Sequence, residues 1–220
     1  EPHGGNALLH RLFGADIRTV EDRDARAPAL QAVAREEKTA GRKALVIPVG
    51  ASSGLGSLGY ARATVELTGQ LADLPPREAT WIFVPASSCG TLAGLLLGIS
   101  LLERRDVRLV GVSADVSAFD MRTETLRLAR EGAGLLEVRG RIREGALACA
   151  DEFVGRGYGI PTRASEEATA LFGRTLGVVL DPVYSAKAAS GMLAWLRKGS
   201  VPGDHRVIFL HTGGHPTLFA

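Results

Sequence analysis

The sequence has 220 residues, of which 45% are hydrophobic and 23% are charged, so it is long and apolar enough to bury a core. Its 26 basic and 24 acidic residues are spread along the chain and leave a net charge of +2. This balance excludes the one-sided basic surface that is typical of nucleic-acid binding. We therefore expect a globular protein with no nucleic-acid partner.

The most apolar run, Leu92–Leu102, is shorter than the ~20 residues that cross a bilayer, and Gly94 and Gly98 interrupt it. We interpret it as a buried helix, so no membrane partner is expected. The chain has two cysteines, Cys89 and Cys149, and no signal-like opening, which argues against secretion and a disulfide framework. We expect a cytoplasmic location and assign no metal site.

Short β-branched runs alternate with segments of helical period, which is the pattern of a parallel sheet covered by helices. The predicted fold class is therefore α/β. The expected strands are Ile17–Val20, Ala44–Val49, Thr80–Pro85, Arg108–Ser113, Leu176–Leu180 and Arg206–His211. The expected helices are Ala7–Phe13, Ala27–Ala40, Leu58–Ala72, Gly90–Leu102, Ser117–Glu131, Ser165–Arg174 and Lys187–Arg197.

Two boundaries have a chemical cause. Pro75 and Pro76 end the preceding helix and predict a division of the chain into residues 1–74 and 75–220. Ser165 is expected to cap the helix that follows it, because a serine hydroxyl accepts from free N–H groups at a helix start.

A first glycine loop, with Gly50, Gly54 and Gly56, follows a predicted strand and begins a helix, as in dinucleotide-binding folds. The spacing also resembles that of short-chain dehydrogenases, which need a Tyr-xxx-Lys pair downstream. Here Tyr184 and Lys187 have only two residues between them, so they lie on different faces of a helix. A short-chain dehydrogenase is therefore a weaker alternative.

A second glycine loop follows the strand Thr80–Pro85 and adds the hydroxyls of Ser87, Ser88 and Thr91. Backbone N–H groups from Ser88 to Thr91 could converge on an anion, and the dipole of the next helix favours negative charge. The loop suits a phosphate monoester. On its own residues, an ordinary glycine- and serine-rich turn is equally compatible.

Taken together and in chain order, six segments resemble motifs of fold-type II pyridoxal-phosphate (PLP) dependent enzymes, in particular the D-cysteine desulfhydrase and ACC deaminase family. The resemblance covers nearly all 220 residues. The segments are Gly5-Asn6 with Gly14-Ala15-Asp16, Ile47–Tyr60, Ser88–Gly94, Gly157–Pro161, Asp181–Tyr184 with Lys187, and His211–Gly214.

The resemblance implies a three-layer parallel sheet covered by helices, as in the β subunit of tryptophan synthase. Residues 75–220 would form the large PLP-binding domain, and residues 1–74 would be part of a smaller α/β domain. It further implies a homodimer that acts on a small amino acid.

By the same resemblance, the cofactor phosphate is expected at Ser88, Cys89, Gly90 and Thr91. Tyr158 and Tyr184 correspond to two active-site tyrosines that orient or transfer protons. Ser185 stands where ACC deaminases have a glutamate beside the pyridine nitrogen. A neutral hydroxyl there would weaken the electron sink and favour α,β-elimination over ring opening. Ser185 is also a candidate helix cap.

Two departures from the family pattern matter. Cys89 replaces a glycine of the phosphate loop, and a helix N-terminus is expected to lower the pKa of its thiol, with a reactive cysteine as a minor alternative. None of the lysines, Lys38, Lys43, Lys187 and Lys198, has the family's Gly-Asn-Lys context. We expect the lysine-bearing segment to lie upstream of Glu1, and Lys187 to be structural.

The sequence therefore predicts a PLP-dependent carbon–sulfur lyase or deaminase, with D-cysteine as the favoured substrate and pyruvate, ammonia and sulfide as its products. ACC deaminase and cysteate sulfo-lyase stay open as alternatives. A non-catalytic fragment or subunit is a further alternative, followed by the dehydrogenase.

Overall fold

A four-stranded parallel sheet organises the structure, a computed structural model that describes residues 4–138 and 142–219. The strand order is β3-β2-β1-β4, so the first two strands in the chain form the centre. Their bounds are β1 Thr80–Ala86, β2 Val107–Ser113, β3 Leu147–Ala150 and β4 Arg206–Phe209.

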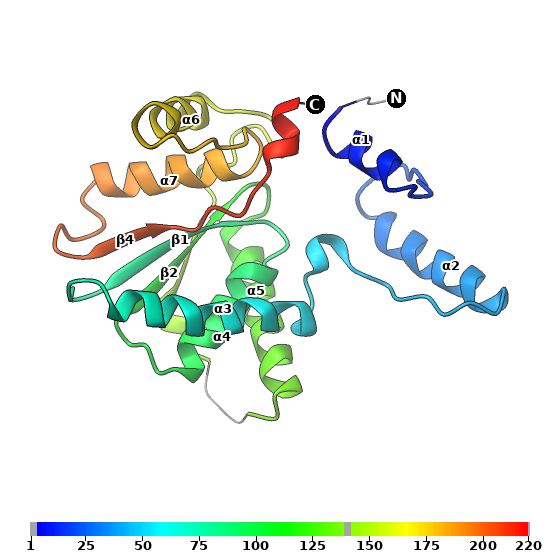
Figure 1. Ribbon diagram of the computed structural model, residues 1–220, viewed down its shortest axis with the longest axis horizontal. Helices are drawn as coiled ribbons and strands as arrows, with labels where there is room; N and C mark the ends of the chain where they lie inside the picture. The colour runs from blue at the N-terminus through cyan, green and yellow to red at the C-terminus, as the bar shows by residue number, and fades with distance from the viewer. Residues whose placement is uncertain (1–3, 139–141, 220) are drawn as a thin grey trace.

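Helices cover both faces of this sheet, which gives three layers (Figure 1). One face carries α3 (Gly54–Ala72), α4 (Gly90–Leu101) and α5 (Ala118–Leu135). The other carries α6 (Arg163–Leu176) and α7 (Ser185–Arg197). The predicted α/β class with a parallel sheet between helices is confirmed.

The central strand β1 is buried on both faces, as expected for a parallel sheet covered on both sides. Ile82 and Val84 belong to the core cluster under α4, whereas Phe83 belongs to the cluster under α7. The Phe83 ring meets the edge of Trp195 at a centroid distance of 5.8 Å. The alternation divides the side chains of β1 between the two core clusters.

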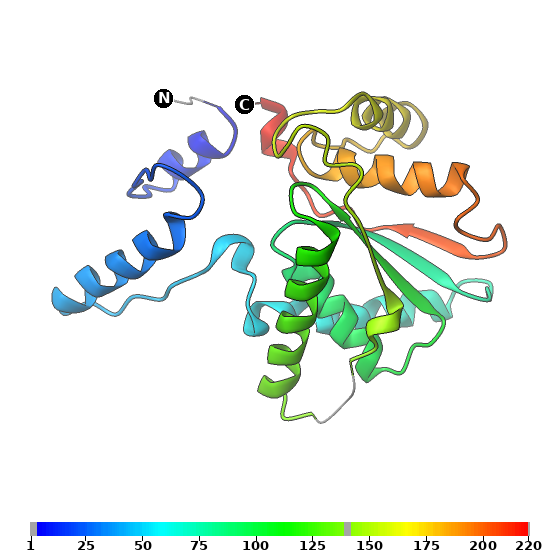
Figure 2. The ribbon, with the colours of Figure 1, turned by 180° about the vertical axis from the view of Figure 1, so that it is seen from behind.

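The chain before α3 stands to one side of the sheet (Figures 1 and 2). It contains α1 (Gly5–Leu12) and α2 (Arg26–Thr39) and then runs extended to the short helix η1 (Val49–Ala51). No residue of α2 is buried, and Leu45 is 86% exposed. Helix α1 contacts η3 (His215–Phe219) near the other end of the chain.

Three predicted strands are wrong. Ile17–Val20 and Ala44–Val49 form no ladder, because no strand among the described residues lies beside them. Leu176–Leu180 is also not a strand, since Leu176 ends α6 and Gly177 follows with φ +65°, the left-handed conformation of a helix end. Strand β3 was not predicted, and it follows the short helix η2 (Glu144–Ala146).

The predicted cap of α6 is displaced by three residues. Thr162 is the N-cap and its hydroxyl accepts from the Ser165 N–H at 3.1 Å, while the Ser165 hydroxyl accepts from the Thr162 N–H at 2.9 Å. Ser165 therefore completes a reciprocal capping box instead of starting the helix.

No helix within residues 4–138 and 142–219 is long and apolar enough to cross a membrane. The division into residues 1–74 and 75–220 stays a prediction. Helix α3, which precedes that division, packs against α4 and α5.

Candidate functional site

A cavity of about 700 Å³ opens at the carboxyl end of β1. Its volume is in the range of small-molecule sites. In parallel sheets this is the end at which ligands bind. It is lined by Asn6, Arg23, Arg26, Val49, Gly50, Tyr60, Ser87, Ser88, Thr91, Tyr158, Asp181, Val183, Tyr184, Thr212, Gly213, Gly214 and Thr217.

The loop between β1 and α4 places free peptide donors at this cavity. Cys89 takes the left-handed conformation, with φ +66°, and α4 begins directly after it. The Gly90 N–H donates to Ser52 Oγ at 3.2 Å. In the part of the chain that the structure describes, the N–H groups of Ser88, Cys89 and Thr91 have no acceptor. Such unpaired donors at a helix start suit an anion.

Ser52, from the first glycine loop, contacts this second loop directly. Its hydroxyl donates to Ser88 Oγ at 2.8 Å. A Cβ at Gly50 would lie 2.3 Å from Ser88 Oγ, and a Cβ at Gly90 would lie 2.7 Å from Ser52 Oγ. The glycines that resembled a dinucleotide signature thus allow two loops to approach each other closely.

The Cys89 thiol points away from the cavity. Its Sγ donates to the Ser87 carbonyl at 3.3 Å, and the residue is 4% exposed within the core under α4. Burial raises the pKa of the Cys89 thiol to about 11. The expectation of a lowered pKa is therefore wrong, because desolvation of the thiolate outweighs the helix N-terminus. The thiol leaves the loop open.

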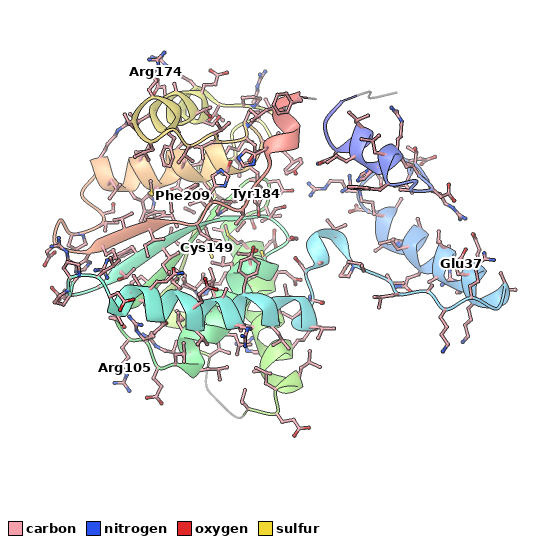
Figure 3. All side chains as sticks on the ribbon, viewed as in Figure 1. Glu37, Arg105, Cys149, Arg174, Tyr184 and Phe209 are labelled. Atoms are coloured by element: carbon pink, nitrogen blue, oxygen red, sulfur yellow. The ribbon has the colours of Figure 1, made fainter. Side chains whose placement is uncertain are left out.

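Tyr184 lies at the end of the sheet that is nearer to α1 and α2 (Figure 3). Its OH donates to the Pro85 carbonyl at 3.0 Å, which joins the start of α7 to the end of β1. Burial raises the pKa of Tyr184 well above its ordinary value. The phenol therefore stays protonated and can donate, whereas a role as a base is disfavoured.

Tyr158 lies in a loop that Lys187 holds in place. The Lys187 ammonium is buried and donates to the carbonyls of Val154 at 2.8 Å and Gly157 at 2.7 Å. Desolvation lowers the pKa of Lys187. Tyr158 itself is 55% exposed and lines the cavity. Lys187 thus has the structural environment that the sequence predicted.

Asp181 organises the start of α7. Its carboxylate accepts from the N–H groups of Val183, Tyr184 and Ser185 at 2.8 to 3.0 Å. Ser185 is fully buried, its hydroxyl donates to Asp181 Oδ1 at 2.6 Å and it accepts from the Asp181 N–H at 2.9 Å. The hydroxyl proton of Ser185 is thus committed to Asp181.

Thr212 supplies an unpaired hydroxyl to the lining of the cavity. Its Oγ1 is buried and has no hydrogen-bond partner among the described residues. Buried polar atoms are normally paired, so this one fits a polar group of a bound molecule. Together with the free loop N–H groups, it suits the cavity to a ligand that carries polar or anionic groups.

An ion pair joins the segment before α3 to the loop. Arg23 Nη2 lies 2.5 Å from Asp115 Oδ2, and Ser87 Oγ donates to Asp115 Oδ1 at 2.7 Å. The Asp115 side chain is 2% exposed. The Arg23 guanidinium also lies over the Tyr158 ring, 5.7 Å from its centroid. Arg23, Ser87 and Tyr158 all line the cavity.

A small cluster at the other end of the sheet, Glu78, Asp204 and His205, is unsuited to a metal. Trp81 Nε1 donates to His205 Nδ1 at 2.9 Å. A neutral histidine then carries its proton on Nε2, which faces the two carboxylates at 3.9 and 4.0 Å. No lone pair of the ring is left for a metal there.

The chain matches a known protein family over almost its whole length. The profile of the PALP family, described as pyridoxal-phosphate dependent enzyme, matches residues 2–213. The chain belongs to the pyridoxal-phosphate dependent enzymes. The cofactor predicted from the sequence is confirmed for the family, and the dehydrogenase alternative is overturned.

Among curated members of this family, D-cysteine desulfhydrase of Salmonella paratyphi C (strain RKS4594) is 35% identical over 219 residues. The alignment covers 98% of this chain and 64% of that relative. D-cysteine desulfhydrase of Salmonella typhi is 34% identical with the same coverage. The chain thus spans just under two thirds of the length of these relatives.

A crystal structure described as that of an ACC deaminase homologue has the same fold. It superposes with a TM-score of 0.86 at 35% identity, and the match covers 100% of this chain and 65% of that one. The likeness confirms the fold-type II architecture that the sequence predicted.

The structure brings most predicted site residues of this PLP-family chain together. Ser88, Thr91, Tyr158 and Tyr184 line one cavity, whereas Cys89 and Ser185 turn their side chains elsewhere. Sequence reasoning did not assign Arg23, Ser52, Asp115 or Thr212. Thr212 lies in the His211–Gly214 motif, which was a usable signal, but the contacts of the other three span 28 to 92 residues of sequence.

Proposed function

We propose that this chain forms the phosphate-binding and tyrosine-bearing part of a PLP-dependent lyase that acts on a small amino acid. The observation that carries the proposal is the convergence of unpaired loop N–H groups, Tyr158, Tyr184 and the orphan Thr212 hydroxyl on one cavity. The D-cysteine desulfhydrase relatives support carbon–sulfur elimination from D-cysteine. Pyruvate, ammonia and sulfide would be the products.

The residues of the second glycine loop would hold the cofactor phosphate. The N–H groups of Ser88, Cys89 and Thr91 supply direct donors, and the hydroxyls of Ser88 and Thr91 add to them. Cys89 would take part through its backbone alone, since its thiol is buried away from the cavity. When bound, PLP supplies the electron sink that makes elimination at Cβ possible.

The two tyrosines would handle protons. Tyr184 is a neutral donor, and its OH must leave the Pro85 carbonyl before it reaches a substrate. We propose that it orients and protonates the substrate. Tyr158, on the exposed side under Arg23, would face the part of the substrate that departs.

The partner of the pyridine nitrogen is either Ser185 or Thr212. We propose a neutral hydroxyl in this role, as the sequence predicted, and the free Thr212 Oγ1 supports Thr212. Ser185 would first have to release Asp181. Thr212→Val and Ser185→Ala separate the two, because only the true partner's loss shifts the absorbance spectrum of the bound cofactor.

A second activity has one supporting observation, the likeness to the ACC deaminase homologue. Assays of the whole protein with D-cysteine and with ACC decide between them. We expect sulfide release from D-cysteine and little ammonia release from ACC. Ammonia from ACC without sulfide from D-cysteine would reverse the assignment, and neither product would support the non-catalytic alternative.

We further propose, on the family resemblance, that the whole protein is a homodimer in the cytoplasm. The unpaired Cys89 and Cys149 are compatible with a reducing compartment. Light scattering on the purified protein tests the dimer: a mass of one subunit would contradict it.

A further inference from the structure

The phosphate loop has a buried negative charge beside it. Asp115, which follows β2, is almost fully buried and accepts from the Ser87 hydroxyl of the loop at 2.7 Å. Ser87 is the neighbour of Ser88, whose N–H is one of the proposed phosphate donors. A phosphate carries up to two negative charges, so a carboxylate in this place opposes its binding.

Arg23 is the one cation that pairs with Asp115 in the described residues. It comes from the segment between α1 and α2, 92 residues away in sequence. One guanidinium nitrogen binds Asp115, and the group also lies over the Tyr158 ring at the cavity. The other N–H groups of the Arg23 guanidinium bind no second carboxylate among the residues that the structure describes.

We propose that Arg23 is a positioning residue: it offsets the charge of Asp115 and thereby allows the Ser87–Thr91 loop to hold a phosphate group. Asp115 fixes the Ser87 hydroxyl, and Arg23 compensates the resulting charge from the other side. This inference rests on the proposed function of the loop. It also gives the segment before α3 a part in cofactor binding.

The test compares two ligands that differ only in the phosphate, pyridoxine 5'-phosphate and pyridoxine, neither of which can form a covalent bond with lysine. Calorimetric titration of the full chain gives both dissociation constants. The dissociation constant of pyridoxine divided by that of pyridoxine 5'-phosphate is the phosphate preference of the chain, and this is the ratio that the variants should change. Arg23→Gln should lower this ratio about tenfold, because it leaves the Asp115 carboxylate unpaired. Arg23→Lys keeps a cation and should retain most of the ratio.

The decisive variant is the double substitution Arg23→Gln with Asp115→Asn. Asparagine still accepts from Ser87 but carries no charge, so the double variant should recover phosphate preference to within about threefold of the wild type. A purely structural role would make the double variant no better than Arg23→Gln. Arg18→Gln is the control, since Arg18 pairs with Glu36 inside the same segment at 2.6 Å and does not line the cavity.

Loss in Arg23→Gln with recovery in the double variant supports the inference. An unchanged ratio in Arg23→Gln, or no recovery in the double variant, overturns it and leaves the phosphate loop in place. A wild type that binds both ligands equally would overturn the proposed function as well. Thermal unfolding of each variant checks that it is folded, and the double variant, which leaves no unpaired charge, keeps the test valid if Arg23→Gln is unstable.

Discussion

Lys187 illustrates, at the residue scale, how a motif residue acquires a structural role. It matches a family motif, yet its ammonium is buried and bound to two backbone carbonyls. Those bonds tie helix α7 to the loop that carries Tyr158. Burying a lysine is costly unless its ammonium is hydrogen-bonded, and here two backbone carbonyls accept from it.

Lys187→Met tests this role. The methionine keeps the volume but leaves the carbonyls of Val154 and Gly157 without this donor, which should destabilise the fold by ~2–4 kcal/mol. Chemical denaturation measures the loss. The control Lys198→Met, at an exposed helix end, should change the free energy of unfolding by less than ~0.5 kcal/mol. Equal effects would show that Lys187 does no more than a surface lysine.

The cysteines are a second residue-scale case. Burial raises the pKa of both Cys89 and Cys149 to about 11, against an ordinary value of 9.0. At pH 8 the thiolate fraction is then roughly 100-fold below that of an ordinary thiol. We expect slow labelling by iodoacetamide at pH 8 and a rise only as the pH approaches 11.

The stability of the fold should fall at alkaline pH because of these raised thiol pKa values. A pKa raised in the folded state stabilises the fold at pH values below the pKa of the unfolded state, and this contribution is lost as pH rises from about 9 towards 11.

For the labelling experiment, the same chain in denaturant is the control and should react fully at pH 8. Fast labelling of the folded chain at pH 8 would contradict the burial of Cys89 and the partial burial of Cys149.

At the element scale, the contact between α3 and α4 depends on small residues. A Cβ at Gly94 would lie 2.2 Å from the Ser57 carbonyl, and one at Gly98 would lie 2.4 Å from Thr64 Oγ1. The two helix backbones therefore lie closer than larger residues permit, and this closeness aligns the two loops that precede them at the cavity.

Gly94→Ala should destabilise the fold by ~1–3 kcal/mol, because the methyl group forces the helices apart. Gly69→Ala, in the same helix pair, is the matched control. No atom lies within 4 Å of a Cβ there, so alanine should instead stabilise α3 by ~0.5–1 kcal/mol. Thermal unfolding of both variants gives the comparison, and a stabilising Gly94→Ala would contradict the packing.

The elements also show what a sequence can predict. Helices α1 to α7 were predicted because helical periodicity and apolar runs are local signals, and β1, β2 and β4 because buried parallel strands are apolar runs. Strand β3 was missed, since Leu147–Ala150 has no β-branched residue and forms a strand through its pairing with β2. The predicted strands Ile17–Val20 and Ala44–Val49 failed for the opposite reason, because they lack a neighbour.

The residues of the candidate site were also predictable only where the signal is local. Ser88, Thr91, Tyr158 and Tyr184 lie in local motifs and were predictable. Asp115 and Arg23 were not, because their roles exist only after β2 and the segment before α2 meet in space. The direction of the Cys89 thiol also depends on the core around it rather than on its position at a helix start.

At the scale of the whole molecule, the packing suggests a domain boundary earlier than the proline pair. Helix α3 contributes Ala61 to the core cluster of the sheet, and Leu58 and Leu67 pack against that cluster. None of the described residues before η1 belongs to it. We propose that the sheet unit begins near Val49, although residues 1–74 and 75–220 were the division predicted from the sequence.

Two truncations test this boundary. Residues 49–220 should unfold cooperatively with a midpoint close to that of the full chain. Residues 75–220 lack α3 and expose the apolar face of α4, which should cost roughly 5 kcal/mol and abolish the cooperative transition. If residues 75–220 fold as well as residues 49–220, the boundary at Pro75 and Pro76 is right.

The central claim is that the peptide groups between β1 and α4 bind a phosphate ester, and a crystal structure of this chain grown with PLP tests it most directly. We predict the phosphorus atom within hydrogen-bonding reach of the N–H groups of Ser88, Cys89 and Thr91, with the aromatic ring towards Thr212. Density for the cofactor elsewhere, with the loop unchanged and vacant, would contradict the account.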